Sequence, residues 1–200
     1  MATATFGLQA KKFPHLKGLK GISDELLETH FKLYEGYVNN CNILHQKVEE
    51  LTKGGKSGTP EYSELKRRYG FEHNGVILHD YYFENMKSSG NPIDQNGKLY
   101  KKICECFWDW NTFEQDFKNV GKMRGIGWAI LFQDPNTKRL SNHFIMDHEN
   151  GNPAGYKPIL VMDVWEHAYI PDYKATERAK YIDAFWGNVD WKMVESRLLG

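Results

Sequence analysis

Apolar residues between positions 23 and 54 recur every three or four residues, which is the spacing of one face of an α-helix. This face consists of Leu27, His30, Tyr34, Tyr37, Cys41, Leu44, Val48 and Leu51. The strict alternation of threes and fours is typical of a helix packed lengthwise on a partner. Ser23 can cap the helix, and Gly54 with Gly55 can end it. Because His30 lies on the apolar face, we expect its ring to point into the protein.

A second helix is predicted to begin at Thr59, with Pro60 at its first position. Gly70 and Gly75 weaken this helix or let another element come close. Its apolar face contains one polar member, Glu72, and consists otherwise of Leu65, Tyr69, Val76, His79, Phe83 and Met86. His79 is therefore also expected to point inward, so two antiparallel helices would each present one inward histidine.

The segment 87–98 is rich in loop-forming residues and is the best candidate for a boundary. It divides the chain into an N-terminal helical hairpin domain, residues 1–90, and a C-terminal α/β domain, residues 91–200. Two hundred residues are enough for one domain or for two small ones that share a core.

The second half alternates between helical and strand patterns. Residues 99–123 have helical spacing, and helical spacing returns from Thr176 onward. The stretches 128–133 and 139–148 flank a turn-like segment and predict a β-hairpin, while 158–165 predicts a third strand. The prediction is therefore an α+β fold, with an antiparallel helical hairpin followed by an α/β half whose three-stranded antiparallel sheet is flanked by helices.

Composition narrows the functional classes. The 26 basic and 26 acidic residues balance, so the net charge gives no reason to expect nucleic acid or an anionic membrane as a partner. No apolar run approaches the ~20 residues of a membrane span. The N-terminus lacks the apolar segment of a secretory signal. Cys41, Cys104 and Cys106 are too few for a disulfide framework, so we expect free thiols in a reducing cytoplasm.

Three ionisable residues follow the apolar start of the third strand: Asp163, Glu166 and His167. Burying an unpaired carboxylate costs several kcal/mol. A metal ion would supply the positive charge that makes a buried Asp163 tolerable. Together with the inward His30 and His79, this stretch provides three imidazoles and one carboxylate, a set that suits a mononuclear transition metal such as iron or manganese.

The chain resembles the iron/manganese superoxide dismutases. The strongest match is DVWEHAY at 163–169, which fits the family's signature of Asp, any residue, Trp, Glu, His, a small residue and an aromatic. Further segments match in the family's order: ISDELLETH ending at His30, YVNN at 37–40, LHDYYF around His79, GIGWAIL at 125–131 and AFWGNVDW at 184–191. The family's two-domain layout agrees with the layout that the patterns predict.

By position, the resemblance implies that His30, His79, Asp163 and His167 bind one iron or manganese ion per chain, with a solvent molecule at a fifth position. It implies that the metal cycles between its 2+ and 3+ states. One superoxide leaves as dioxygen and a second leaves as hydrogen peroxide, which would make the protein an antioxidant enzyme.

The same resemblance gives roles to residues around the metal. Tyr37 matches a tyrosine that gates the substrate, and Trp128 and Trp165 match rings that wall the site. Glu166 matches a residue that reaches the partner's copy of His167, which implies a homodimer or a higher homo-oligomer.

Metal identity in the family depends partly on one side chain near the bound solvent. Iron-type members commonly supply a glutamine from the position of Gly75, and manganese-type members supply it from the hairpin strand. Counting from Leu140, that second place holds His148 here. This histidine resembles a branch of the family in which either metal works, so the choice between iron and manganese stays open.

Two departures from the family pattern are visible. Tyr37 follows His30 by one residue fewer than usual, and the unbroken apolar spacing predicts a regular helix between them. A histidine and a tyrosine that usually meet across the dimer are replaced by Tyr34 and Ile170, so we expect that contact to be absent.

The residues also allow three alternatives. The first is a non-catalytic metal-binding protein of the same fold. The second is a mononuclear non-haem iron oxygenase, which would use two histidines and one carboxylate. The third is a mononuclear hydrolase with His148 as its general base.

Overall fold

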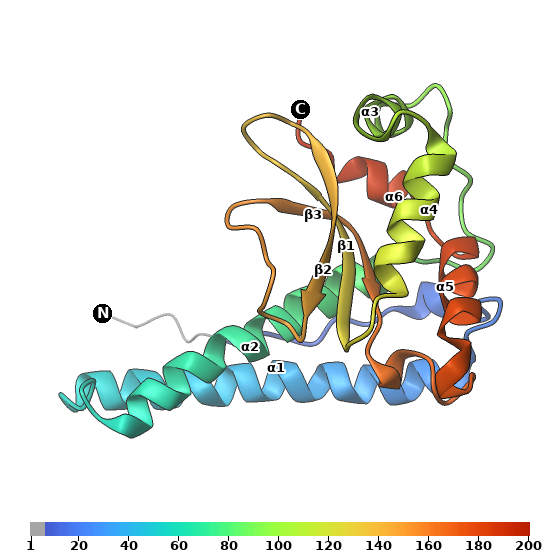
Figure 1. Ribbon diagram of the computed structural model, residues 1–200. Coiled ribbons are helices and arrows are strands. Elements are labelled where there is room, and N and C mark those ends of the chain that lie inside the picture. Colours follow the sequence, from blue (N-terminus) through green and yellow to red (C-terminus); the bar gives the residue numbers. More distant parts are fainter. Residues whose placement is uncertain (1–6) are drawn as a thin grey trace.

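A computed structural model describes residues 7–200, and residues 1–6 lie outside the described part. A long helical hairpin lies along one side, and a small sheet with further helices packs beside it (Figure 1). The two long helices are α1, Asp24–Lys53, and α2, Pro60–Glu84. The side chains of Ser23 and Thr59 accept hydrogen bonds from the first turns of these helices, as capping residues do.

The inner face of the hairpin forms largely as the apolar spacing predicts, although Tyr37, Val48 and Leu51 are only half-buried. The buried members of the predicted α1 face are Leu27, His30, Tyr34, Cys41 and Leu44. Helix α1 is α-helical throughout its 30 residues, which confirms the regular helix predicted between His30 and Tyr37. On α2, Glu72 is buried as the one polar member, and its carboxylate pairs with Arg68 at 2.6 Å.

Residues 99–123 are largely helical, as predicted, but a turn divides them. The structure has two helices there, α3 at Lys98–Phe107 and α4 at Trp110–Gly121. Trp108 separates them with a positive φ of 70°, and the Asp109 amide donates to the Phe107 carbonyl in a tight turn. Apolar residues continue at helical spacing on both sides of this turn, so the spacing does not reveal it.

The three predicted strands form one antiparallel sheet in the order β2-β1-β3. The central strand is β1, Gly127–Gln133, and all its residues are buried. Its neighbours are β2, Leu140–Met146, and β3, Lys157–Asp163. Trp128 pairs with Asp163, so the start of the central strand and the end of β3 lie side by side.

Short elements complete the chain. They are the 3-10 helices η1, Pro14–Leu16, η2, Glu166–Ala168, and η3, Ala175–Glu177, and the α-helices α5, Arg178–Gly187, and α6, Trp191–Ser196. The loop between α2 and α3 pairs with the C-terminal region, through Met86 with Val189 and Asn91 with Asp190. The division into domains at residue 90 stays a prediction. Across residues 7–200, every helix is too short or too polar to cross a lipid bilayer.

Candidate metal centre

Four separate elements bring the predicted ligands together. His30 comes from α1, His79 from α2, Asp163 from the end of β3 and His167 from η2. The first three side chains are fully buried, and that of His167 is 22% exposed. One ligand atom from each residue lies within 4.8 Å of those from the others. The fold therefore brings together four residues that are far apart in the sequence.

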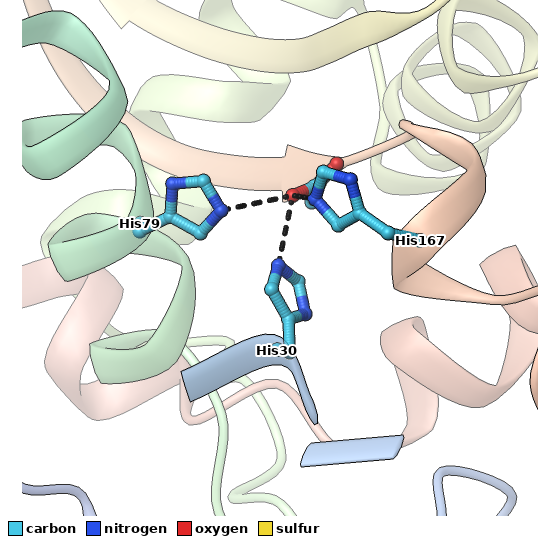
Figure 2. A group of neighbouring side chains, drawn as sticks. His30, His79 and His167 are labelled. Carbon is cyan, nitrogen blue, oxygen red and sulfur yellow. Dashed lines mark hydrogen bonds and ion pairs between the residues drawn. The ribbon is translucent and has the colours of Figure 1, made fainter. Parts of the chain in front are cut away.

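The three imidazoles converge on one carboxylate oxygen (Figure 2). The Nε2 atoms of His30, His79 and His167 lie 3.2, 3.6 and 3.3 Å from Oδ2 of Asp163. The other oxygen, Oδ1, accepts the backbone N–H of Trp165 at 2.8 Å. This bond orients the carboxylate so that Oδ2 faces the three rings.

The hydrogen bond of His79 indicates that the cluster needs a cation. Its Nδ1–H donates to the Gly75 carbonyl, one turn earlier on α2, at 2.6 Å. In a neutral ring the Nε2 lone pair then faces the Asp163 carboxylate, and this buried Nε2 has no hydrogen-bond partner among residues 7–200. Two acceptors that face each other in a buried site repel unless a cation lies between them. The donor set therefore fits a metal ion of the iron or manganese type.

Burial controls the charges of the cluster. It lowers the pKa of His30, and it lowers that of His79 well below the usual value, which favours neutral rings. Burial alone would raise the pKa of the Asp163 carboxyl, but His167 and His30 beside it hold that pKa below its usual range. The result is a carboxylate beside the neutral rings of His30 and His79, the protonation states in which these three groups can ligate a metal.

A second layer of hydrogen bonds joins three of the predicted site residues. The indole Nε1–H of Trp128 donates to Nδ1 of His148 at 3.0 Å. Nε2 of His148 lies 3.0 Å from the Tyr37 hydroxyl. Gly75 makes room for this group, because a Cβ there would lie 2.7 Å from Cδ1 of Tyr37. His148 thus lies next to Gly75 and Tyr37, but it follows the end of β2 at Met146 and is not on the strand predicted over 139–148. Its place near the bound solvent stays a prediction.

Aromatic rings enclose this layer. Trp165 stacks on His148 and His167, with ring centroids 5.0 and 5.8 Å apart. Trp128 meets His79 edge-on at 5.0 Å and is fully buried. Burial lowers the pKa of His148 to about 4 and raises that of Tyr37 above its usual range. Both groups are therefore neutral near pH 7, and their hydrogen bond is strengthened by its buried surroundings.

The residues at the expected dimer contact differ in their exposure. Glu166 and Ile170 are exposed on the single chain. Trp165, next to Glu166, has a buried Nε1–H without a partner in the described part of the chain. Tyr34 is buried, and its hydroxyl accepts the backbone N–H of Lys11 at 3.0 Å. Tyr34 is thus bonded within its own chain, and the absence of a contact with Ile170 across a dimer stays a prediction.

Several residues that shape the site were not predicted. Phe71 meets the ring of His148 edge-on at 4.5 Å. The Tyr181 hydroxyl donates to the Asp163 carbonyl at 2.7 Å, and Asn74 donates to the His148 carbonyl at 2.8 Å. Of these, Asn74 carries a signal in the sequence, because Asn and Gly are both poor helix formers and stand together about one turn before the ligand on α2.

Comparison with known proteins agrees with this geometry. Residues 95–197 match the family model for the C-terminal domain of iron/manganese superoxide dismutases. The chain is 37% identical over 190 residues to an iron superoxide dismutase of Aquifex pyrophilus, covering 92% of this chain and 88% of the relative. It is 35% identical over 183 residues to an iron superoxide dismutase of Pyrobaculum aerophilum, covering 88% and 84%.

A relative from Aeropyrum pernix, named for both manganese and iron, is 33% identical over 183 residues, covering 88% of this chain and 83% of the relative. The family model matches about half of the chain, and these relatives extend the similarity over most of it. The chain therefore belongs to the iron/manganese superoxide dismutase family.

Proposed function

We propose that His30, His79, Asp163 and His167 hold the one iron or manganese ion with which this metal-dependent superoxide dismutase works. The observation that carries the proposal is the Nε2 lone pair of His79, which faces the Asp163 carboxylate in a fully buried site. Family membership adds the reaction, in which two superoxide ions yield dioxygen and hydrogen peroxide. When bound, the metal would supply the one-electron chemistry that neither imidazole nor carboxylate can supply.

The surrounding residues have a role in proton supply. Forming hydrogen peroxide from superoxide consumes two protons, and the Tyr37 ring lies beside both His79 and His148, at 5.2 and 5.0 Å between centroids. Because Trp128 donates to Nδ1 of His148, the neutral ring carries its proton on Nε2 and donates to the Tyr37 oxygen. The Tyr37 proton is then free to point towards the substrate. Trp128 and Trp165 exclude water from this space.

The proposed assembly involves Glu166. This residue is exposed beside His167 and is matched to one that contacts the partner's ligand in the family. Two copies would pair through this surface, and each Glu166 would orient the partner's His167 as a carboxylate behind a metal-bound histidine does. The three free thiols support a reducing compartment such as the cytoplasm.

The geometry argues against the two other enzyme classes. An oxygenase site with two histidines and one carboxylate leaves positions open for a cosubstrate, whereas here a third imidazole occupies the same cluster. A hydrolase would need His148 to take a proton from water. Its Nδ1 lone pair already accepts the Trp128 N–H, so it has no free base for that step.

Ligand variants test the proposal. His79→Ala and Asp163→Ala each remove one ligand and should lose both bound metal and superoxide-consuming activity. His73→Ala, on the same helix but outside the cluster, is the matched control and should keep both. Metal content by elemental analysis and superoxide consumption are the readouts. A ligand variant with full metal content and full activity would refute the assignment.

A further inference from the structure

His148 lies just beyond the end of its strand. Strand β2 ends at Met146, and Asp147 turns the chain with a positive φ of 54°. His148 therefore lies in a turn, which Asn150 closes by donating its backbone N–H to the Met146 carbonyl at 3.1 Å. On the side of the sheet, Trp128 bonds the His148 ring, and the Asp147 N–H donates to the Ile126 carbonyl at 3.2 Å. The backbone of His148 itself needs a further anchor if the distance from its ring to Tyr37 is to stay fixed.

The anchor comes from α2. The Asn74 side-chain amide donates to the His148 backbone carbonyl at 2.8 Å. A second amide, from Asn152, donates to the same carbonyl at 3.1 Å and to the Glu149 carbonyl at 3.2 Å. Asn152 belongs to the same loop as His148, so its bonds hold the loop together. Of these two amides, the one from Asn74 ties the loop to a helix.

The same part of α2 also holds His79. Gly75, next to Asn74, accepts the Nδ1–H of His79 and leaves space for the Tyr37 ring. Residues 74–79 of α2 therefore fix the ligand His79 through one hydrogen bond and the loop of His148 through another. The two imidazoles lie 6.2 Å apart, between ring centroids.

This arrangement explains two residues that are unfavourable in a helix. Asn and Gly lower helix stability relative to alanine, yet they stand side by side at positions 74 and 75 of α2. Gly75 is required by the Tyr37 ring, and Asn74 bonds the His148 carbonyl. Two adjacent residues that are unfavourable in a helix, and that both contact the site, indicate a functional requirement.

We propose that Asn74 is a positioning residue, which fixes the distance between His148 and Tyr37 and thereby the balance between iron-supported and manganese-supported activity. This inference rests on the proposed superoxide dismutase site. Asn74 acts through His148, because its amide bonds the His148 backbone and its own side chain is not among the four candidate ligands.

The test uses the full chain loaded separately with iron and with manganese. Asn74→Ala removes the amide. Asn74→Leu removes it while keeping the side-chain volume, and both replacements favour a helix more than asparagine does. Asn152→Ala is the matched control, since it removes an amide from the same carbonyl without breaking the link to α2. The readouts are the ratio of the two metal-supported activities and the reduction potential of the iron-loaded chain.

Both Asn74 variants should change the activity ratio by about threefold or more, the effect expected of one net hydrogen bond. The iron potential should move by about 30 mV or more, which is a threefold change at ~59 mV per tenfold for one electron. Asn152→Ala should change the activity ratio and the iron potential by less than the Asn74 variants do. Potentials of the Asn74 variants equal to the wild type, or an equal shift in Asn152→Ala, would overturn the inference. If the Asn74 variants shift the iron potential but the wild-type chain consumes no superoxide, the positioning role of Asn74 would be supported and the proposed function refuted.

Discussion

The indole N–H of Trp128 donates to Nδ1 of His148 across 3.0 Å, and this one bond decides which nitrogen of the His148 ring carries the proton. The ring is neutral because burial lowers its pKa to about 4. Its proton is therefore on Nε2, 3.0 Å from the Tyr37 hydroxyl oxygen. An imidazole in this state has one N–H to give, and it gives it to Tyr37.

His148→Gln should keep the metal but change the ratio of iron-supported to manganese-supported activity. A glutamine amide can accept from Trp128 and still has two N–H groups, so the donors around the metal change in number. His148→Ala should lower both activities. One hydrogen bond to a charged or polarised group is worth roughly 1.5–3 kcal/mol, which corresponds to a change in reduction potential of about 65–130 mV for one electron. Metal analysis, both activities and the potential are the measurements. His148→Ala with normal activities and a normal potential would show that His148 does not influence the metal.

Acid should destabilise the metal-free protein partly through His148. Its folded pKa of about 4 lies below the ordinary value of 6.5, so the unfolded state binds more protons between these values. Stability is therefore lost as the pH falls from about 6.5 to 4, by at most about 3 kcal/mol from this residue. Urea unfolding at several pH values should show a smaller loss for His148→Gln than for the wild type. Equal losses in the two proteins would contradict a neutral, buried His148.

Glu166→Ala should weaken the dimer and lower activity together, because the proposed contact both joins the chains and orients the partner's ligand. The effect on activity should be about tenfold or more, as for other groups that orient a metal-bound histidine. Sedimentation and superoxide assays over a dilution series are the measurements. Glu105→Ala, which removes a surface carboxylate on α3, is the control. A fully active monomer at low concentration would place Glu166 outside the site.

Trp108→Gly should stabilise the fold by about 1 kcal/mol. A non-glycine residue at positive φ costs about 1–3 kcal/mol, and glycine gives back about 0.5–1 kcal/mol through its unfolded-state entropy. The Trp108 ring is 84% exposed, so little packing is lost. Urea unfolding should show the gain for glycine and none for Trp108→Ala, which keeps a Cβ at the same φ. An equal gain in both variants would show that exposure of the ring, and not the backbone, is the cause.

Three of the four candidate ligands could be predicted from periodic patterns. His30 and His79 follow the apolar faces of two helices, and Asp163 ends an apolar strand, so their burial and direction were predictable. The break at Trp108 was missed because apolar spacing continues through it and glycine, the usual residue at positive φ, is absent there.

The strand order and the loop bonds could not be predicted in the same way. Three strands of similar apolar character do not reveal which one is central, and β1 lies between its two neighbours. The bond from Asn74 to the His148 carbonyl joins residues 74 positions apart, and it depends on how a turn meets a helix. Periodicity within one element carries no information about such a contact.

The cluster of His30, His79, Asp163 and His167 should hold the metal that supports superoxide disproportionation. The most direct measurement is superoxide consumption by the purified chain after the metal has been removed by unfolding with a chelator and restored by refolding with iron or manganese. We predict that the metal-free chain is inactive, that at least one metal restores consumption with release of peroxide, and that one ion is bound per chain. A chain that binds one ion of either metal at this cluster and consumes no superoxide with either would contradict this assignment, and would show instead a metal-binding protein of the same fold.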